Sequence, residues 1–291
     1  MAAASNRAPL IEKTFRVLKK KYSPVPSVER SILENLLYAC GLENTRFELA
    51  DECFARIQET FFDWNEVRVT TVRELAELMS GVANPVQAAT NLKHTLHSVF
   101  EAQYEFDLES LRKQNLGVAI KQLESYRGVT PFAASFAVQH ALGGHSIPIC
   151  EGSLDLMQII GVITESEYAN RKVPGLERAI AKTKGIEFAS LLHQLAAAFV
   201  ASPFNNEVRG IILEISPDAK ERLPKRARKK TEPEKKETAK KSTTKKKKKT
   251  TTTAAPKKAT KKAAEKPSVA KKKTKAAKKS ATKKLTKRKP R

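Results

Sequence analysis

Apolar residues recur at helical spacing through the first two thirds of the chain. Ile32, Leu36 and Leu37 form one such stripe, and Ser27 is placed to cap the helix that carries it. Strand-like alternation is nearly absent, so the pattern predicts an all-α body of about ten short helices with short connections. The helices are expected over residues 9–21, 28–39, 45–61, 69–79, 85–103, 107–125, 153–160, 164–170, 174–183 and 185–201.

A change of composition near Pro217 divides the chain. Residues 1–219 contain 22 Lys and Arg against 26 Asp and Glu, whereas residues 220–291 contain 33 against 5, which gives net charges of −4 and +28. The first part is long enough to bury a hydrophobic core. The basic part has almost no large apolar residues to offset the entropy of ordering, so a disordered tail is expected over 217–291.

The basic tail mixes lysine doublets with Ala, Thr and Pro, a composition that resembles the tails of linker histones and bacterial histone-like proteins. Such a tail is expected to bind DNA through its phosphates, with an affinity that falls steeply with salt because each contact releases counterions. A solubility tail or an arm for an acidic protein is the alternative. The densest run consists of Lys245, Lys246, Lys247, Lys248 and Lys249.

The chain has three cysteines, an odd number, and no two of them have the Cys-x-x-Cys spacing: they are Cys40, Cys53 and Cys150. This usage favours a reducing compartment. The first residues lack the apolar run of a secretory signal, and no stretch of 18 apolar residues occurs. We therefore expect an intracellular protein without a membrane span, in the cytoplasm or nucleoid of a bacterium or in the nucleus of a eukaryote.

The stretch SYRGVTPFA holds a glycine turn between two predicted helices. Arg127, Gly128, Val129 and Thr130 form the turn, and Pro131 begins a helix of small residues. A helix-hairpin-helix of this kind lets backbone N–H groups approach a DNA phosphate at a helix N-terminus. An ordinary helical turn is the alternative, because Thr130 stands at the second glycine position.

The order of the segments around this turn resembles the helix-hairpin-helix DNA glycosylase superfamily, of the endonuclease III type. The family hairpin reads LPGVGRKTA and a later segment reads V-D-T-H, and the matching stretches here are SYRGVTPFA and I-C-E-G. The stretch Asn91–Lys93 resembles a short NSK-like motif, which adds Lys93 to the expected DNA contacts. The resemblance covers roughly 27–215 and implies an N-terminal helix and linker over 1–26, a central lobe over 27–149 and a second lobe over 150–216.

Two departures from the family concern catalysis. Bifunctional members carry a lysine after the hairpin glycines, whose amine attacks C1′ of the sugar, and Phe132 occupies that position. The family aspartate aligns with Cys150, whose thiol, at an ordinary pKa of about 8.5, is neutral at pH 7. Glu151, one residue after Cys150, is the candidate catalytic carboxylate. One residue along a helix turns the side chain by about 100°, so Glu151 would point in a different direction from the family aspartate. A surface or capping role is its alternative, and Asp155 is expected to be an exposed first-turn acid.

Two more departures concern the iron–sulfur cluster and the wedge. Many relatives hold a four-iron cluster through C-x6-C-x2-C-x5-C, but residues 198–219 contain no cysteine, so no cofactor is expected. Apolar packing must close this end instead. In the family a glutamine fills the gap left by a flipped base, and Glu43 matches it, with Asn44 or Arg46 as substitutes after a small shift. A helix-capping loop is the alternative.

The remaining candidates favour structural roles. His94 and His97 lie three residues apart on one predicted helix face, but no third ligand is near in sequence, so a solvated face is preferred to a metal site. His193, between leucines, is expected in the core or at its rim. Trp64 is expected in the core rather than as a base-stacking residue.

These observations favour a DNA-binding protein of the endonuclease III-like fold that has lost base-excision chemistry, linked to base-excision repair or chromosome organisation. The body would prefer kinked, flipped or damaged DNA, and the tail would supply most of the affinity. One alternative is an active glycosylase or abasic-site lyase that uses Glu151. The other is a protein-interaction module, in which the acidic body binds a protein and the tail tethers it to DNA. The sequence indicates no oligomeric state.

Overall fold

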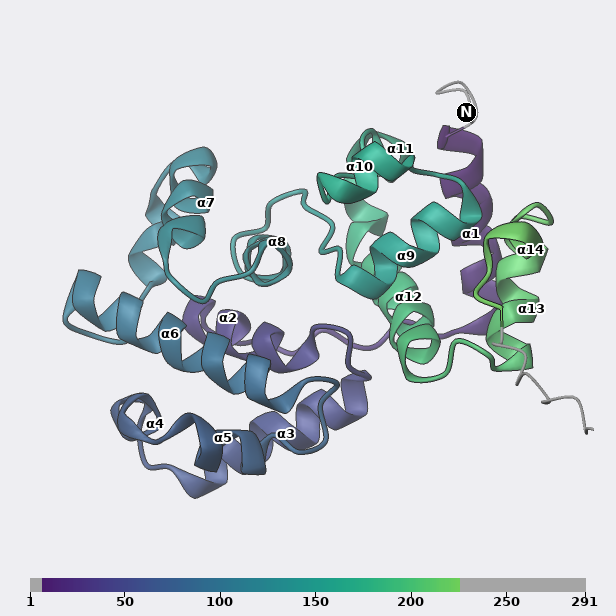
Figure 1. Cartoon of the computed structure of the whole chain (residues 1–291). Coiled ribbons are helices and arrows are strands. Elements are labelled where there is room, and N and C mark those ends of the chain that lie inside the picture. The colour runs from purple at the N-terminus through teal and green to yellow at the C-terminus, as the bar shows by residue number, and fades with distance from the viewer. Residues whose placement is uncertain (1–6, 226–291) are drawn as a thin grey trace, which may run out of the picture. The chain divides into compact units, whose positions relative to one another are not determined.

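The computed structural model describes residues 7–225, and in that range the chain forms fourteen α-helices, one 3-10 helix and no strand (Figure 1). The prediction of an all-α body is confirmed. The pattern missed the short helix α4 and the last two helices. The elements are α1 (Arg7–Lys21), α2 (Ile32–Leu42), α3 (Phe47–Thr60), α4 (Trp64–Val69), α5 (Val72–Leu78), α6 (Pro85–Gln103), η2 (Glu109–Lys113), α7 (Leu116–Ser125), α8 (Pro131–His140), α9 (Glu151–Ile160), α10 (Glu165–Ala169), α11 (Leu176–Ala179), α12 (Lys182–Ala201), α13 (Asn206–Ile215) and α14 (Ala219–Arg222).

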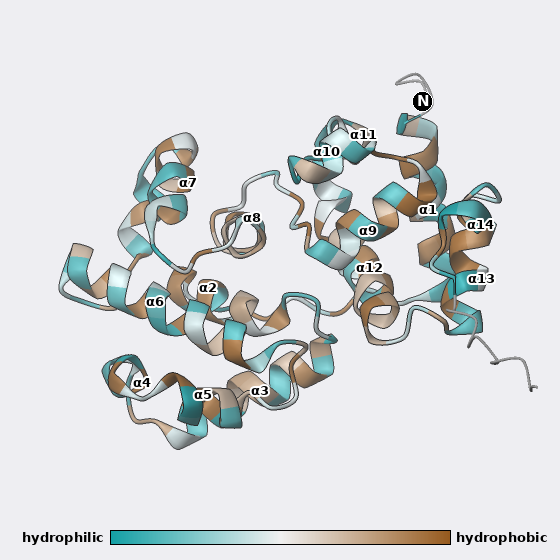
Figure 2. Ribbon diagram, viewed as in Figure 1, coloured by the Kyte–Doolittle hydropathy of each residue, from teal (hydrophilic) through white to brown (hydrophobic). Residues whose placement is uncertain are grey.

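Helix α2 is the centre of a first group of helices and packs against α3, α6 and α8. All its residues except Glu34 are buried, which follows from its nearly continuous apolar sequence. The outer helices of this group alternate hydrophobic and hydrophilic residues, as Figure 2 shows for α6. Helix α8 has seven of its ten residues buried, so the second helix of the hairpin belongs to the core.

A second group of helices forms around α12. Helix α12 contacts α1, α9 and α13, so the N-terminal helix packs with segments more than 160 residues later in the chain. Arg7 anchors the start of α1 by a two-point ion pair to Glu167, with N–O distances of 2.8 and 2.9 Å. The turn between α12 and α13 contains no cysteine and does not fit an iron–sulfur cluster. Its neighbours Phe199, Ile211 and Ile212 are buried in the hydrophobic core instead.

Helix α2 begins later than its sequence pattern predicts. Ser31 is the N-cap: its Oγ accepts from Glu34 N at 3.1 Å, and the Glu34 carboxylate accepts from Ser31 N at 2.8 Å. The expectation that Ser27 caps this helix is wrong, because the capping box satisfies the first-turn N–H groups at Ser31. Ser27 lies instead with its Oγ 3.1 Å from His140 Nδ1.

The folded body extends beyond the predicted start of the tail at residue 217. Ala219 is fully buried and Leu223 is 2% exposed, so α14 belongs to the core. Arg222 donates to the carbonyls of Ile159 and Ile160 at the end of α9, at 2.7 and 3.1 Å. Two apolar residues spaced i, i+4 among charged ones were too weak a signal against the basic composition around them. No helix in the described range is long and apolar enough to cross a membrane.

Candidate nucleic-acid interface

The hairpin turn between α7 and α8 packs tightly against α6. Gly128 has a φ of +97°, in the left-handed region that favours glycine. A Cβ at this position would lie 2.4 Å from Asn91 O and 2.7 Å from Thr95 N. Glycine is therefore required both by the backbone conformation and by the contact with α6.

The turn leaves backbone donors at the start of α8. Val129 N donates to Tyr126 O at 3.2 Å and closes the turn, and Arg127 N donates to Ser98 Oγ at 3.1 Å. Within residues 7–225, the N–H groups of Gly128 and Thr130 have no hydrogen-bond partner. Unpartnered N–H groups before a ten-residue helix, together with the exposed side chain of Arg127, are the features that a phosphate-binding turn requires.

A carboxylate is held against this turn. Thr130 caps α8 by accepting from Ala133 N at 3.1 Å, and its hydroxyl donates to Glu43 Oε2 at 3.0 Å. Burial raises the pKa of Glu43 above its ordinary value, although the bond from Thr130 and the charge of Arg171 act against this, and Glu151 adds to it. The residue at the wedge position of the sequence comparison is therefore fixed to the hairpin.

The two substitutes for the wedge are also engaged. Asn44, in a left-handed conformation with φ +61°, accepts from Gly152 N at 2.9 Å and so joins the end of α2 to the start of α9. Arg46 is exposed and forms a loose ion pair with Glu48, with an N–O distance of 3.6 Å.

The positions that match the family's lysine and aspartate lie in the core. Phe132 is 2% exposed, and its ring stacks on that of His193 at a centroid distance of 5.6 Å. Cys150 is fully buried, with its Sγ 3.2 Å from Ser153 Oγ and 3.9 Å from His193 Nδ1. Burial raises the pKa of the Cys150 thiol, which keeps it protonated at neutral pH. Neither position offers a nucleophile or a negative charge.

His193 joins these two positions to the first helical group. Its Nε2 lies 2.7 Å from Thr45 O, which assigns the proton to Nε2, and the ring of Phe47 meets it edge-on at 5.0 Å. Burial lowers the pKa of His193 to about 4, so the imidazole is neutral at pH 7. At 4% exposure it is a core residue, as its sequence context predicted.

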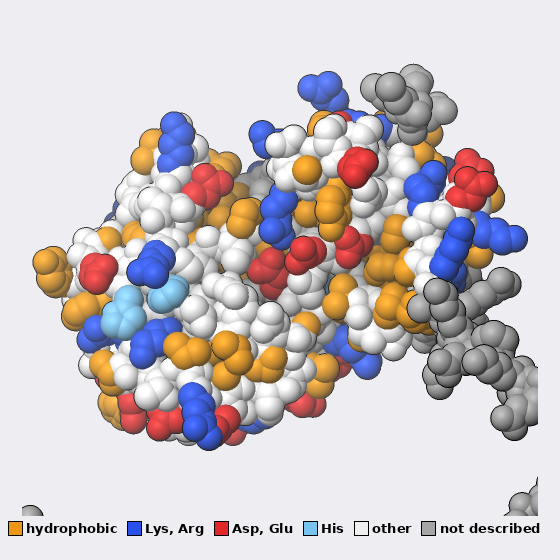
Figure 3. Space-filling model, in the orientation of Figure 1, with side chains coloured by type: hydrophobic (Ala, Val, Ile, Leu, Met, Phe, Trp, Pro, Cys, Tyr) orange, Lys and Arg blue, Asp and Glu red, His pale blue; other side chains and the backbone are white. Residues whose placement is uncertain are grey.

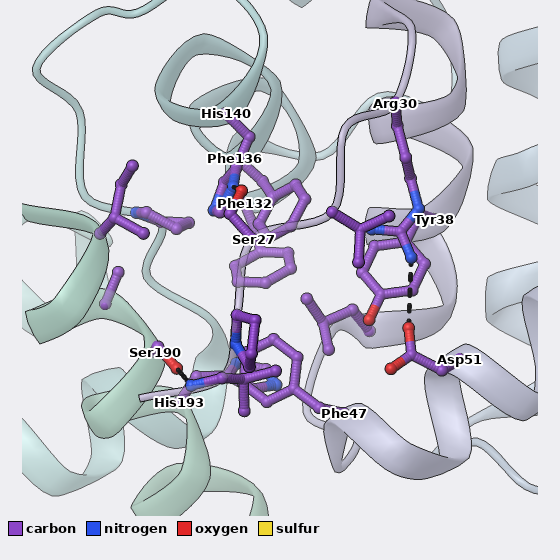
Figure 4. A pocket seen from close by; sticks show the side chains of 17 residues that line it. Ser27, Arg30, Tyr38, Phe47, Asp51, Phe132, Phe136, His140, Ser190 and His193 are labelled. Carbon is purple, nitrogen blue, oxygen red and sulfur yellow. Dashed lines mark hydrogen bonds and ion pairs between the residues drawn. The ribbon is translucent and has the colours of Figure 1, made fainter. Parts of the chain in front are cut away.

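A pocket lies beside His193, between α2, α3, α8 and α12 (Figure 4). Its volume is about 40 Å³, which has room for on the order of three water molecules and not for a nucleobase. Arg30 lies over the Tyr38 ring at 3.9 Å and contacts Asp51 at 3.2 Å, so the two charges on its wall neutralise each other. Six aromatic or imidazole rings form part of the remaining wall: Tyr38, Phe47, Phe132, Phe136, His140 and His193.

Glu151 and Asp155 are in different surroundings. Glu151 is exposed at the first position of α9. Asp155, expected as a simple exposed acid, is half-buried and accepts from the Tyr168 hydroxyl at 2.7 Å, because α10 folds back on α9. Figure 3 shows acidic side chains gathered between α8 and α9, so the place where the two helical groups meet is negatively charged.

The other predicted DNA contacts lie near α6 or outside the described residues. The Lys93 ammonium donates to Thr70 O at the end of α4, which gives this cation a structural partner. Figure 3 shows histidine side chains beside basic ones over α6, and partial burial and the charges of Arg127, His97 and Lys93 lower the pKa of His94. No group of three metal-ligating side chains occurs among the described residues. The lysines 245–249 lie outside the described residues.

Trp64, expected in the core, is half-buried and packs beside Phe54 at 6.0 Å. Sequence reasoning also missed a second basic cluster beside the hairpin. Arg171, Lys172 and Arg178 lie in and around the connection from α10 to α11, a stretch without a motif. The one feature of the sequence that could have indicated this cluster is the Arg171-Lys172 pair between two predicted short helices.

Comparison with known proteins identifies the fold. No family model matches the chain, and no curated protein matches it. The structure of a thermostable thymine-DNA glycosylase is similar with a TM-score of 0.50 and 13% identity, over 76% of this chain and 100% of that chain. A trapped endonuclease III–DNA covalent intermediate has a TM-score of 0.49 and 13% identity, over 77% of this chain and 100% of that chain. An H. pylori 3-methyladenine DNA glycosylase, MagIII, bound to 1,N6-ethenoadenine has a TM-score of 0.42 and 16% identity, over 72% of this chain and 99% of that chain.

The thymine-DNA glycosylase match shows that the chain has the fold of the helix-hairpin-helix DNA glycosylases, as the hairpin and the segments around it predicted. At this level of identity the likeness concerns the fold alone.

Proposed function

We propose that this protein binds DNA with the glycosylase fold and does not excise bases. The observation that carries the proposal is the packing of Phe132 and Cys150 against His193. A lyase step needs an amine nucleophile, and base removal needs a carboxylate that stabilises positive charge on the sugar. The apolar ring of Phe132, the neutral thiol of Cys150 and the neutral imidazole of His193 supply neither group. The proposed DNA binding requires no cofactor.

DNA binding is divided between the tail and the hairpin. The tail, with lysines 245–249 at its densest, supplies most of the affinity through phosphates, because residues 220–291 carry +28 and the first 219 carry −4. The unpartnered N–H groups of Gly128 and Thr130, with the side chain of Arg127, fix one phosphate on the body, and Val129 closes the turn that presents them. A body that fixes a phosphate beside an acidic junction favours a duplex that kinks away from it, as at damaged or unpaired sites.

The test compares the full chain on a duplex with a stable abasic-site analogue and on its intact twin. The tail contributes equally to both, so the ratio of the two affinities reports the body. We expect about ten-fold tighter binding to the abasic duplex, and neither base release nor strand cleavage on damaged substrates. Arg127→Glu is expected to reduce the ratio, because it repels the phosphate at the hairpin.

Equal affinity for the two duplexes contradicts damage preference and leaves the tail as the only DNA-binding part. In that case the acidic body is a protein-interaction module that the tail holds on DNA. Release of a base contradicts the loss of catalysis.

One observation favours a catalytic alternative. Glu43 has a raised pKa, and the charge of the exposed Glu151 contributes to it. A carboxylate with a raised pKa beside a second carboxylate is a common arrangement for general acid and base catalysis. If the protein removes bases by this pair, Glu151→Gln abolishes base release, and Asp155→Asn, on the next turn of α9, leaves it unchanged.

A further inference from the structure

A groove runs from the start of α8 to the connection between α10 and α11. Its volume is about 660 Å³, and it shares no lining residue with the pocket beside His193. Pro131 and Ser135 of α8 form one wall, and residues 171–178 form the other. The groove therefore begins at the first residue of α8, directly after the hairpin turn.

The cations of this groove form no hydrogen bond or ion pair in the described chain, although the charge of Arg171 acts on Glu43. Arg171, Lys172 and Arg178 are exposed, and none of their side chains makes a hydrogen bond or ion pair with residues 7–225. Glu177 is the one acid in the lining, and its backbone carbonyl accepts a hydrogen bond from His145 Nε2 at 2.7 Å. Three cations against one carboxylate leave the groove positive in a body that is negative as a whole.

The backbone holds these cations in place. Arg171 has a left-handed φ of +52°, and its N–H donates to Tyr168 O at 2.9 Å, while Lys172 N donates to Glu167 O at 3.0 Å. These bonds close the end of α10 and turn the chain into the groove. Glu167 is also the partner of Arg7, so the loop is fixed to α1.

The chemistry of the lining fits a sugar–phosphate backbone. Apolar residues such as Ile147 and Ile149 form part of the lining, and no aromatic side chain is among the residues that line it. Recognition of unpaired bases depends on aromatic stacking, whereas a duplex backbone needs cations for its phosphates and tolerates apolar contact with its sugars. The unpartnered donors of the hairpin lie at the same end and point to the same ligand class.

We infer that this groove binds the phosphodiester backbone of duplex DNA next to the phosphate that the hairpin holds. The inference rests on the proposed function and adds a second contact to it. Arg171, Lys172 and Arg178 contact successive phosphates, which fixes the direction of the duplex on the body. The acidic junction between α8 and α9 then lies beside the bound strand and keeps the strand out of the closed centre.

The experiment uses the full chain and two triple variants. One variant carries Arg171→Glu, Lys172→Glu and Arg178→Glu. The matched control carries Lys13→Glu, Arg16→Glu and Lys20→Glu, three exposed cations of α1 that likewise lack ion pairs in the described chain. Binding to a short intact duplex is measured over a range of salt concentrations around 0.1 M.

The groove variant is expected to bind about ten-fold more weakly than the α1 variant near 0.1 M salt. Its plot of log K against log salt is expected to be shallower by about 2 to 3, since each lost phosphate contact removes about 0.9 from the slope. If the two variants have equal affinities and slopes while the wild type binds the duplex, the inference that the groove binds DNA is overturned and the proposed function is not. Failure of the wild type to bind the duplex overturns the proposed function as well.

A polyglutamate peptide provides the remaining arm. If the groove variant loses polyglutamate binding and keeps the affinity of the α1 variant for DNA, the groove serves an acidic protein and the inference is overturned. Equal thermal unfolding of the three proteins, expected because all six side chains are exposed, shows that the differences arise from binding.

Discussion

At His193, three contacts determine one protonation state. The Thr45 carbonyl accepts from Nε2, Phe132 covers one face of the ring, and Cys150 lies 3.9 Å from Nδ1. The family resemblance places Phe132 and Cys150 at the positions of a nucleophile and an acid. It does not show that both pack on the same imidazole, because α8 and α12 are brought together only by tertiary packing.

The burial of His193 makes stability depend on pH. Its folded pKa is about 4 against an ordinary 6.5, so the unfolded chain binds the extra proton as the pH falls below 6.5. The free energy of unfolding is expected to decrease by about 3 kcal/mol between pH 6.5 and 4 from this group, and the contribution is fully present above pH 6.5. Urea unfolding across this range measures it.

His193→Phe isolates the effect. The variant is less stable at pH 7, since the Thr45 carbonyl loses its donor, but it loses less stability than the wild type on acidification. Parallel curves of unfolding free energy against pH for the two proteins would show that His193 is not the group responsible.

A comparison of Gly128 and Gly143 distinguishes two requirements for glycine: a left-handed φ and a lack of space for a Cβ atom. Both have a left-handed φ, at +97° and +60°, but a Cβ meets the α6 backbone at Gly128 and nothing within 4 Å at Gly143. Gly128→Ala is expected to cost about 3 kcal/mol from the strained φ and the overlap together, and Gly143→Ala about 1 kcal/mol from φ alone. Chemical denaturation of both variants measures the difference. Similar losses would mean that α6 moves away to admit the methyl group.

At the scale of the helices, the sequence was informative where a long period of apolar residues repeats. It predicted α3, α6 and α12 with small errors at their ends, and the glycine turn before α8. It missed α4 and α14, which are six and four residues long and too short to show a period, and it also missed the ten-residue α13. It also missed the contact of Thr130 with Glu43, because the two residues are 87 positions apart.

Helix α14 gives a prediction about the end of the folded body. Leu223 is 2% exposed among the residues of the core, whereas Lys220 in the same segment is exposed. Leu223→Ala in the full chain is expected to lower the free energy of unfolding by about 3 kcal/mol, the cost of a cavity in a packed core. Lys220→Ala is the control and is expected to change it by less than about 0.5 kcal/mol. If both variants unfold like the wild type, α14 contributes nothing to the body.

At the scale of the whole chain, positive and negative charge are unevenly distributed along the sequence. The first 219 residues carry −4 and residues 220–291 carry +28, so the proposed function assigns long-range attraction to DNA to the second part. It assigns positioning on the duplex to the first part, through the hairpin donors and the groove beside them. Such a division predicts that affinity and preference respond to different substitutions.

The tail lysines test this division. Replacing lysines 245–249 by glutamine is expected to reduce the salt slope of log K by up to about 4.5, because five phosphate contacts are lost. The preference for abasic over intact duplex is expected to stay unchanged, since the hairpin and groove are intact. A matched variant replaces five other tail lysines: Lys271, Lys272, Lys273, Lys275 and Lys278.

The two tail variants distinguish a distributed polycation from a local motif. A polycation binds through charge density, so both sets of five should produce the same loss of slope and affinity in titrations of the full chain. A loss confined to lysines 245–249 would mean that this run binds DNA as a defined site. A changed abasic preference in either variant would mean that the tail takes part in recognition, and the body could then not be the only reader of DNA geometry.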